Sequence, residues 1–298
     1  MKVKPLLITG SHRSGTTIMG EIFSKSKKLY LLYEPFNKDL GIKNINHWYP
    51  YQSKDYKKIV DSFLNMNFSL KERGISFIRK TFKSRKNIRY YLYKYFFKYF
   101  KKPIIKDPFL LFFSDYLNEK FNYNVIIMVR HPAAFCYSLK RLEWNFDFSN
   151  FIKQEKLIEE HLRDEVKLYE KNLSYYEKMA LLWRSLYKVM LEKVDGKKGS
   201  DGIIIQKHEQ FAKNMYESVK TISETFGIEF NSSMKKYIKK INNNKRLKVK
   251  KNKLHDFDRN PKKITDYWKK YISKKDLNII RKYSEPISGK FYDEKSWE

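Results

Sequence analysis

The residues with the clearest chemistry lie in the loop Gly10–Thr17, of sequence GSHRSGTT. The apolar run Leu6–Ile8 before this loop predicts a buried strand, and the apolar spacing after Thr16 predicts a helix. In such a loop, free backbone N–H groups and the positive end of the helix dipole face the same point. The sequence therefore predicts a phosphate site here, and a Gly/Ser turn without a ligand is the alternative.

One position separates this loop from the loop that binds nucleoside triphosphates, G-x-x-x-x-G-K-[ST]. Gly10 and Gly15 have the right spacing and Thr17 supplies the hydroxyl, but Thr16 stands in place of the lysine that contacts the β- and γ-phosphates. Arg13 instead offers a guanidinium that can bind a phosphate or sulfonate through two parallel hydrogen bonds. We therefore expect an anionic nucleotide that is not used as a triphosphate.

Three further charged residues lie at the ends of predicted buried strands: Glu34 after Leu29–Tyr33, Lys106 after Pro103–Ile105, and Arg130 after Asn124–Val129. Open α/β sheets bind ligands at the carboxyl ends of their strands, so each residue is a candidate for the site. Pro35 predicts an extended backbone at Glu34. A carboxylate in a surface turn is the alternative reading of Glu34.

Arg130 stands where an enzyme that hydrolyses Mg²⁺-nucleotides would carry an aspartate. This is a second feature that argues against a nucleoside triphosphate. Pro132 suits the first turn of the next helix, and Ser138 would lie on that helix, about two turns from Arg130. The two residues share a ligand only if the helix folds back toward the strand.

Strands alternate with helices along the chain, which predicts an α/β fold with a P-loop-type central parallel β-sheet flanked by helices. A length of 298 residues allows about two domains, but it is also common for one α/β domain. We interpret residues 1–298 as a single domain. It would contain a basic aromatic helical insertion at about 55–102 and a helical segment at about 150–194.

The chain is strongly basic, with 63 Lys and Arg against 33 Asp and Glu, a formal net charge of +30. Such a charge favours phosphates, acidic glycans, acidic membrane or nucleic acid as partners. In residues 71–102, Lys and Arg alternate with Phe and Tyr. This pattern fits a surface helix for an anionic polymer or membrane, and it also fits a helix that covers the core with a solvated Lys face.

Cys136 is the only cysteine, so no disulfide forms within the chain and a reducing compartment is allowed. No apolar run approaches the ~18 residues of a membrane span, and no apolar leader is visible. We therefore expect a cytoplasmic protein, with peripheral membrane contact as an open option. The histidines and the cysteine show no metal-ligand spacing, which predicts chemistry without a metal.

Several short motifs, taken together, resemble those of sulfotransferases that use 3′-phosphoadenosine 5′-phosphosulfate (PAPS). GSHRSGTTIM, YEPF, IKDPF, VIIMVRHPAAFCYS and HEQF occur in that family's order and cover roughly residues 5–36, 103–140 and 203–228. The likeness is greater to the protein-tyrosine and carbohydrate branches, because the cytosolic branch usually carries a lysine in the first loop and a catalytic histidine. HEQF departs from the family's usual YEDL.

The resemblance implies a role for each matching residue. Glu34 takes the place of the general base, Lys106 that of a cation near the transferred group, and Arg13 joins Lys106 on the leaving group. Arg130 and Ser138 would hold the 3′-phosphate. The loop for the 5′-phosphosulfate would comprise Arg13, Ser14, Gly15, Thr16 and Thr17, and residues 259–263 would form the late loop that closes over the cofactor.

The implied activity is transfer of a sulfuryl group from PAPS to a hydroxyl of a glycan, a glycolipid or a peptide tyrosine, leaving 3′,5′-ADP. The resemblance implies no metal and no specific nucleic acid. Two alternatives stay open at this point. One is a P-loop kinase, and the other is a basic module that binds nucleic acid or a membrane surface.

Overall fold

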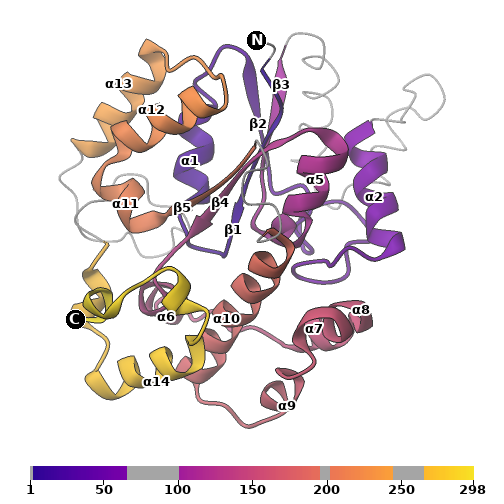
Figure 1. The fold of residues 1–298 in the computed structure, drawn as a ribbon, viewed down its shortest axis with the longest axis vertical. Coiled ribbons are helices and arrows are strands. Elements are labelled where there is room, and N and C mark those ends of the chain that lie inside the picture. Colours follow the sequence, from indigo (N-terminus) through magenta and orange to yellow (C-terminus); the bar gives the residue numbers. More distant parts are fainter. Residues whose placement is uncertain (1–2, 66–100, 195–201, 244–264) are drawn as a thin grey trace.

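The described residues are built around one sheet of five parallel strands (Figure 1). The computed structural model describes residues 3–65, 101–194, 202–243 and 265–298. The strands stand in the order β2-β3-β1-β4-β5 and are β1 (Leu6–Gly10), β2 (Leu29–Tyr33), β3 (Lys102–Lys106), β4 (Asn124–Val129) and β5 (Ile203–Lys207). Every neighbouring pair is parallel, which confirms the predicted fold class.

The central strands are apolar because both of their faces are covered. All five residues of β1 and all six of β4 are buried, as expected for parallel strands between two helical layers. In the register of the sheet, Ile8 lies beside Lys106 and Gly10 lies beside Met128. The carboxyl ends of β3, β1 and β4 therefore meet at one edge of the sheet.

Helices cover the two faces of the sheet (Figure 1), and each face has its own cluster of buried apolar side chains. One face carries α1 (Thr16–Phe23), α11 (His208–Lys213), α12 (Met215–Thr225) and α13 (Ser232–Asn242). The other carries α2 (Lys54–Asn65), α5 (Ser114–Phe121), α6 (Pro132–Lys140) and α10 (Tyr175–Val194). The α1 and α6 helices begin just after β1 and β4, at the edge where the charged residues gather.

Shorter elements connect these helices and end the chain. Between α6 and α10 lie α7 (Ser149–Ile152), α8 (Glu155–Leu157), the π-helical turn η2 (Ile158–Leu162) and α9 (Val166–Tyr169). After β3 comes the 3-10 helix η1 (Pro108–Phe113). The C-terminal part contains η5 (Tyr267–Lys270), α14 (Lys274–Ser284), η6 (Ser288–Lys290) and η7 (Glu294–Trp297).

The helical segment predicted at about 150–194 is divided, and the residues near Asn172, between α9 and α10, are not helical, which is where its pattern predicts a break. The part before this break forms short pieces, and the stretch from Phe109 to Phe121, whose pattern predicts one helix, divides into η1 and α5. The stretch from His208 to Phe226 divides at Asn214, whose backbone is not helical. The side chain of Gln154 accepts a hydrogen bond from Tyr51 N (2.7 Å), a distant contact that local periodicity does not encode.

The C-terminal segment is held against the end of β4 by an aromatic cluster. The His131 ring stacks on Trp268, with centroids 4.9 Å apart and planes 7° apart, and Tyr292 and Trp297 contact it edge-on. The Glu209 carboxylate accepts hydrogen bonds from His131 N (3.0 Å) and from the Tyr292 hydroxyl (2.9 Å). These contacts place Trp268 beside His131, which follows Arg130 at the end of β4.

Some predictions fall outside the described residues. Most of the basic aromatic insertion, at 66–100, and the late loop at 259–263 are among them. The assignment of residues 1–298 to one domain stays a prediction. Among the helices of the described ranges, none is long and apolar enough to cross a membrane.

Candidate active site

The first loop has the tight backbone that its glycines predict. Gly15 is the residue before α1 and has a φ of 95°, and a Cβ atom there would lie 2.5 Å from His208 Nδ1. Ser14 Oγ donates a hydrogen bond to Ser11 O (2.6 Å), which closes the turn on itself. Only glycine fits at position 15 without strain, so the loop can bring its backbone N–H groups close to an anion.

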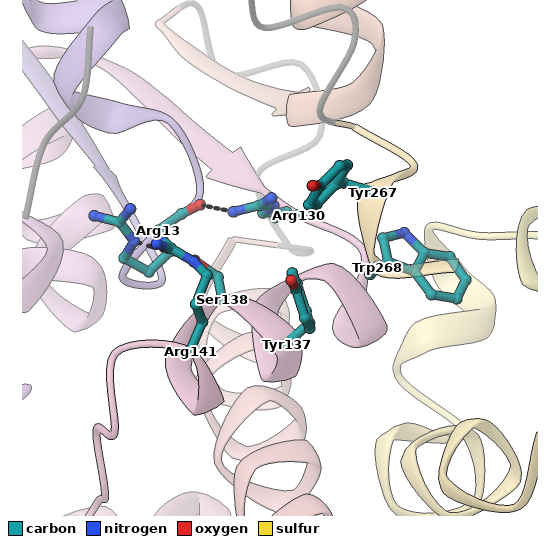
Figure 2. A pocket seen from close by; sticks show the side chains of 7 residues that line it. All are labelled: Arg13, Arg130, Tyr137, Ser138, Arg141, Tyr267 and Trp268. Carbon is teal, nitrogen blue, oxygen red and sulfur yellow. Dashed lines mark hydrogen bonds between the residues drawn. The ribbon is translucent and has the colours of Figure 1, made fainter. Parts of the chain in front are cut away.

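Two predicted site residues are joined directly to this loop, as Figure 2 shows. Arg130 Nη1 donates a hydrogen bond to Arg13 O (2.7 Å), and Arg13 Nε donates one to Ser138 Oγ (3.2 Å). The Trp183 indole N–H on α10 donates to Arg130 O (2.8 Å) and fixes the backbone there. The α6 helix therefore does fold back, and it brings Ser138 to the same place as Arg130.

These residues line one pocket at the carboxyl edge of the sheet (Figure 2). Its lining residues are Arg13, Arg130, Tyr137, Ser138, Arg141, Tyr267 and Trp268, and none of these described residues is acidic. Three guanidinium groups around a small space, with a hydroxyl and aromatic rings beside them, suit a multiply charged anion attached to a flat ring. The lining of the pocket therefore suits an anionic group such as a phosphate.

A second cluster forms where β2 and β3 end. Glu34 and Lys106 form an ion pair, although the Lys106 residue is only 1% exposed. Asn37 Nδ2 donates a hydrogen bond to the other carboxylate oxygen of Glu34 (3.0 Å). The structure thus brings together two residues that the sequence predicts at the ends of separate strands.

The backbone of Glu34 differs from the predicted extended conformation. Its φ is 46°, in the left-handed region that residues other than glycine rarely adopt. Glu34 N donates a hydrogen bond to Lys106 O (2.8 Å), and Asn37 N donates to Glu34 O (3.2 Å). The prediction was wrong because these two bonds hold a turn against the local preference that Pro35 imposes. Strain of this kind is often concentrated at functional sites.

The charges of this cluster shift one another's pKa. Burial raises the pKa of Glu34, but the charge and hydrogen bond of Lys106 outweigh it and hold the pKa below its usual 4.5. Burial lowers the pKa of Lys106 below 10.5 against the opposing effect of Glu34. Burial, with the nearby Glu34 charge, also raises the pKa of Asp107 to about 8. Glu34 is therefore ionised at neutral pH, which is the state a proton acceptor needs.

Tyr33 connects the ion pair to the first loop. Its hydroxyl lies 3.0 Å from Thr17 Oγ1 in a hydrogen bond, and Lys106 Nζ lies 4.3 Å from the centre of its ring. A Cβ atom on Gly20 would meet the Lys106 side chain at 3.3 Å, so α1 packs closely on it. The Glu34–Lys106 pair therefore lies beside the first turns of α1, next to the predicted phosphate loop.

Sequence reasoning missed some residues at this edge of the sheet. Arg141 follows Ser138 by three positions, a helical spacing that could have revealed it. The His12 ring contacts four aromatic rings, those of Trp48, Tyr49, Phe109 and Trp144. Burial lowers the pKa of His12 to about 3, so its imidazole is neutral. In the sequence, only the position of His12 inside the loop motif could have indicated that it lies at this site.

Metal-ligating side chains and the cysteine thiol offer no further site in the part of the chain that the structure describes. The described ranges contain no group of three or more His, Cys, Asp or Glu residues that could hold a metal ion. Cys136 is buried, and burial raises the pKa of its thiol, which disfavours the reactive thiolate.

The fold and the site together define an α/β protein with a parallel sheet, a glycine-bounded loop after β1 and an arginine-lined pocket at the end of β4. The profile of the sulfotransferase family matches residues 5–232, so the chain belongs to this family of enzymes, which typically use PAPS. This confirms the family expected from the motifs, without distinguishing its branches.

Two solved structures share the fold across nearly the whole chain. The sulfotransferase domain from the curacin biosynthetic pathway has 13% identity and a TM-score of 0.51, with 95% of this chain and 98% of that chain covered. The sulfotransferase domain from the Synechococcus PCC 7002 olefin synthase has 14% identity and a TM-score of 0.50, covering 98% and 96%. Among curated proteins, none matches this chain closely enough to count as a relative.

Proposed function

We propose that this sulfotransferase moves a sulfuryl group from PAPS to a hydroxyl of a glycan, a glycolipid or a peptide tyrosine. One observation carries the proposal: Arg13 bonds to Ser138 and accepts from Arg130, so that the first loop and the end of β4 form one anion pocket. When bound, PAPS supplies the sulfuryl group on its 5′-phosphate. Residues of this chain bind the nucleotide, accept the proton and stabilise the charge of the leaving group.

Binding of the nucleotide divides between the two sides of the pocket. Arg130 and Ser138 hold the 3′-phosphate, because both line the pocket and both can donate hydrogen bonds to phosphate oxygens. The 5′ side is held by backbone N–H groups of the loop and by the hydroxyls of Thr16 and Thr17, with Ser14 and Gly15 shaping the turn.

Glu34 accepts the proton of the acceptor hydroxyl. Its pKa is held below 4.5, so the carboxylate is ionised at neutral pH and can accept a proton, and a hydrogen bond from Asn37 orients it. Lys106 and Arg13 stabilise the negative charge that grows on the leaving oxygen, since the buried Lys106 ammonium and the Arg13 guanidinium of the loop are both cations at this edge of the sheet. The nucleotide product is 3′,5′-ADP. Cationic side chains carry the charge stabilisation, and the proposal invokes no metal ion.

Transfer of labelled sulfate from PAPS to a panel of glycans, glycolipids and tyrosine peptides tests this function. We expect label in at least one acceptor class, and we expect it to fall with the Glu34→Gln variant. Mg²⁺-dependent consumption of ATP without any sulfate transfer would overturn the proposal in favour of a P-loop kinase.

We also propose that the protein is cytoplasmic and contacts acidic membrane peripherally. The net charge of +30 and the single buried cysteine support this. Co-sedimentation with vesicles tests the contact: binding to vesicles of anionic lipid but not of neutral lipid is the expected result, and no binding to either would contradict it.

A further inference from the structure

Arg141 is a pocket residue that the proposed function does not use. It ends α6, where its backbone N–H donates a hydrogen bond to Tyr137 O (3.1 Å). Figure 2 shows its side chain rising from the end of the helix toward Arg13 and Ser138. Within the described ranges, no side chain forms a hydrogen bond or ion pair with its guanidinium.

A cation at the C-terminal end of a helix is favourable in any protein, because it faces the negative end of the helix dipole. The helix dipole alone does not explain why the Arg141 side chain lines the pocket. Ser138 and Arg141 are three residues apart and so lie on one face of the helix, the face that closes the pocket. Arg141 therefore adds a third guanidinium to a space that already holds two.

Two of the three arginines form hydrogen bonds with neighbours in the pocket. Arg13 commits its Nε to Ser138, and Arg130 commits one N–H to the Arg13 carbonyl. Like charges that line one pocket repel one another, and an anion that lies between them removes this repulsion. A phosphate monoester has three acceptor oxygens and a charge between about −1.5 and −2 at pH 7, which suits several guanidinium groups at once.

We propose that Arg141 is a third ligand of the 3′-phosphate and makes the enzyme select nucleotides that carry this group. The inference rests on the proposed function, since it assigns the same pocket to the same nucleotide. It adds a specificity-determining residue that lies outside the first loop and outside the pair formed by Arg130 and Ser138.

Calorimetry on the full chain with 3′,5′-ADP and with AMP tests this role. The Arg141→Met variant should bind 3′,5′-ADP about 10- to 100-fold more weakly and should bind AMP unchanged, because only the first nucleotide has a 3′-phosphate. Arg141→Lys should fall between the wild type and Arg141→Met, since a lysine keeps the charge without the planar fork. Arg163→Met, at an exposed arginine outside the pocket, is the matched control and should change neither affinity.

The possible results distinguish a failure of the Arg141 role from a failure of the proposed function. Should the wild type bind 3′,5′-ADP no better than AMP, the proposed function itself fails. A wild-type preference that survives intact in Arg141→Met overturns only the role of Arg141. Equal weakening of both nucleotides also overturns it, and thermal unfolding without ligand shows whether such a loss comes from the fold.

Discussion

The carboxylate of Glu34 and the ammonium of Lys106 form a buried ion pair across 72 positions of the chain. The pair exists because β2 and β3 are neighbours in register, with Tyr33 beside Lys106 at their carboxyl ends. Glu34 follows directly and turns back onto Lys106 O. In the proposed function, the sheet thus brings the proton acceptor and a cation together beside the loop that is proposed to bind the phosphate.

Replacing Glu34 with glutamine should lower the rate of sulfuryl transfer about 100-fold or more, because an amide cannot take the proton of the acceptor. The affinity for 3′,5′-ADP should stay within a factor of about two, since Glu34 is not among the residues that line the pocket. Steady-state transfer and calorimetry measure the two effects. Glu224→Gln, at an exposed position on α12, is the control. An unchanged rate in Glu34→Gln would remove Glu34 from its role.

The same substitution should give a pH-dependent loss of stability. The pKa of Glu34 is lower in the fold than its usual 4.5, so its contribution is fully present above pH 4.5 and is lost as the pH falls through the folded value. At pH 7 we expect Glu34→Gln to reduce the free energy of unfolding by about 1–3 kcal/mol, because the buried Lys106 ammonium loses its carboxylate partner. Urea unfolding of both proteins at pH 7 and at about pH 3.5 tests this. A difference that grows toward acid pH would contradict the sign.

Gly15→Ala should weaken both the fold and the phosphate site. At a φ of 95° an alanine is strained by about 1–2 kcal/mol, and its Cβ would press on the His208 ring. The loop must then shift its N–H groups, so we expect 3′,5′-ADP to bind more than about tenfold more weakly. Urea unfolding and calorimetry measure both changes.

Gly289→Ala is the control for Gly15→Ala. A Cβ there meets only the flexible carboxylate of Glu285, at 3.1 Å, and should cost little. If Gly15→Ala bound 3′,5′-ADP like the wild type, the loop would not be the phosphate site.

Much of the sheet could be predicted because its strands have a strong local signature. A continuous apolar run such as Asn124–Val129 identifies a buried parallel strand, and the charged residue after it marks the edge where ligands bind. Glu34, Lys106 and Arg130 were located by this argument. Which of them would meet could not be predicted, because their pairing depends on the strand order, which places β1 between β3 and β4.

The errors arose where distant contacts override local preference. The backbone of Glu34 follows its hydrogen bond to Lys106 O and not the preference set by Pro35. The segment predicted as helical at about 150–194 forms short pieces before α10, and among them Gln154 accepts a hydrogen bond from Tyr51 N and donates one to Tyr49 O (3.2 Å) on a separate loop. Such bonds exist only once the sheet has assembled, so periodicity alone cannot reveal them.

Calorimetry of the wild-type protein with 3′,5′-ADP and with ADP tests the central claim most directly, namely that one pocket holds two separate phosphates of one nucleotide. ADP carries a similar charge but has both phosphates on the 5′ side, so it cannot reach Arg130 and Ser138 in the same way. We predict that 3′,5′-ADP binds at least about tenfold more tightly than ADP. Equal affinity for the two nucleotides, or no binding of 3′,5′-ADP, would contradict the account.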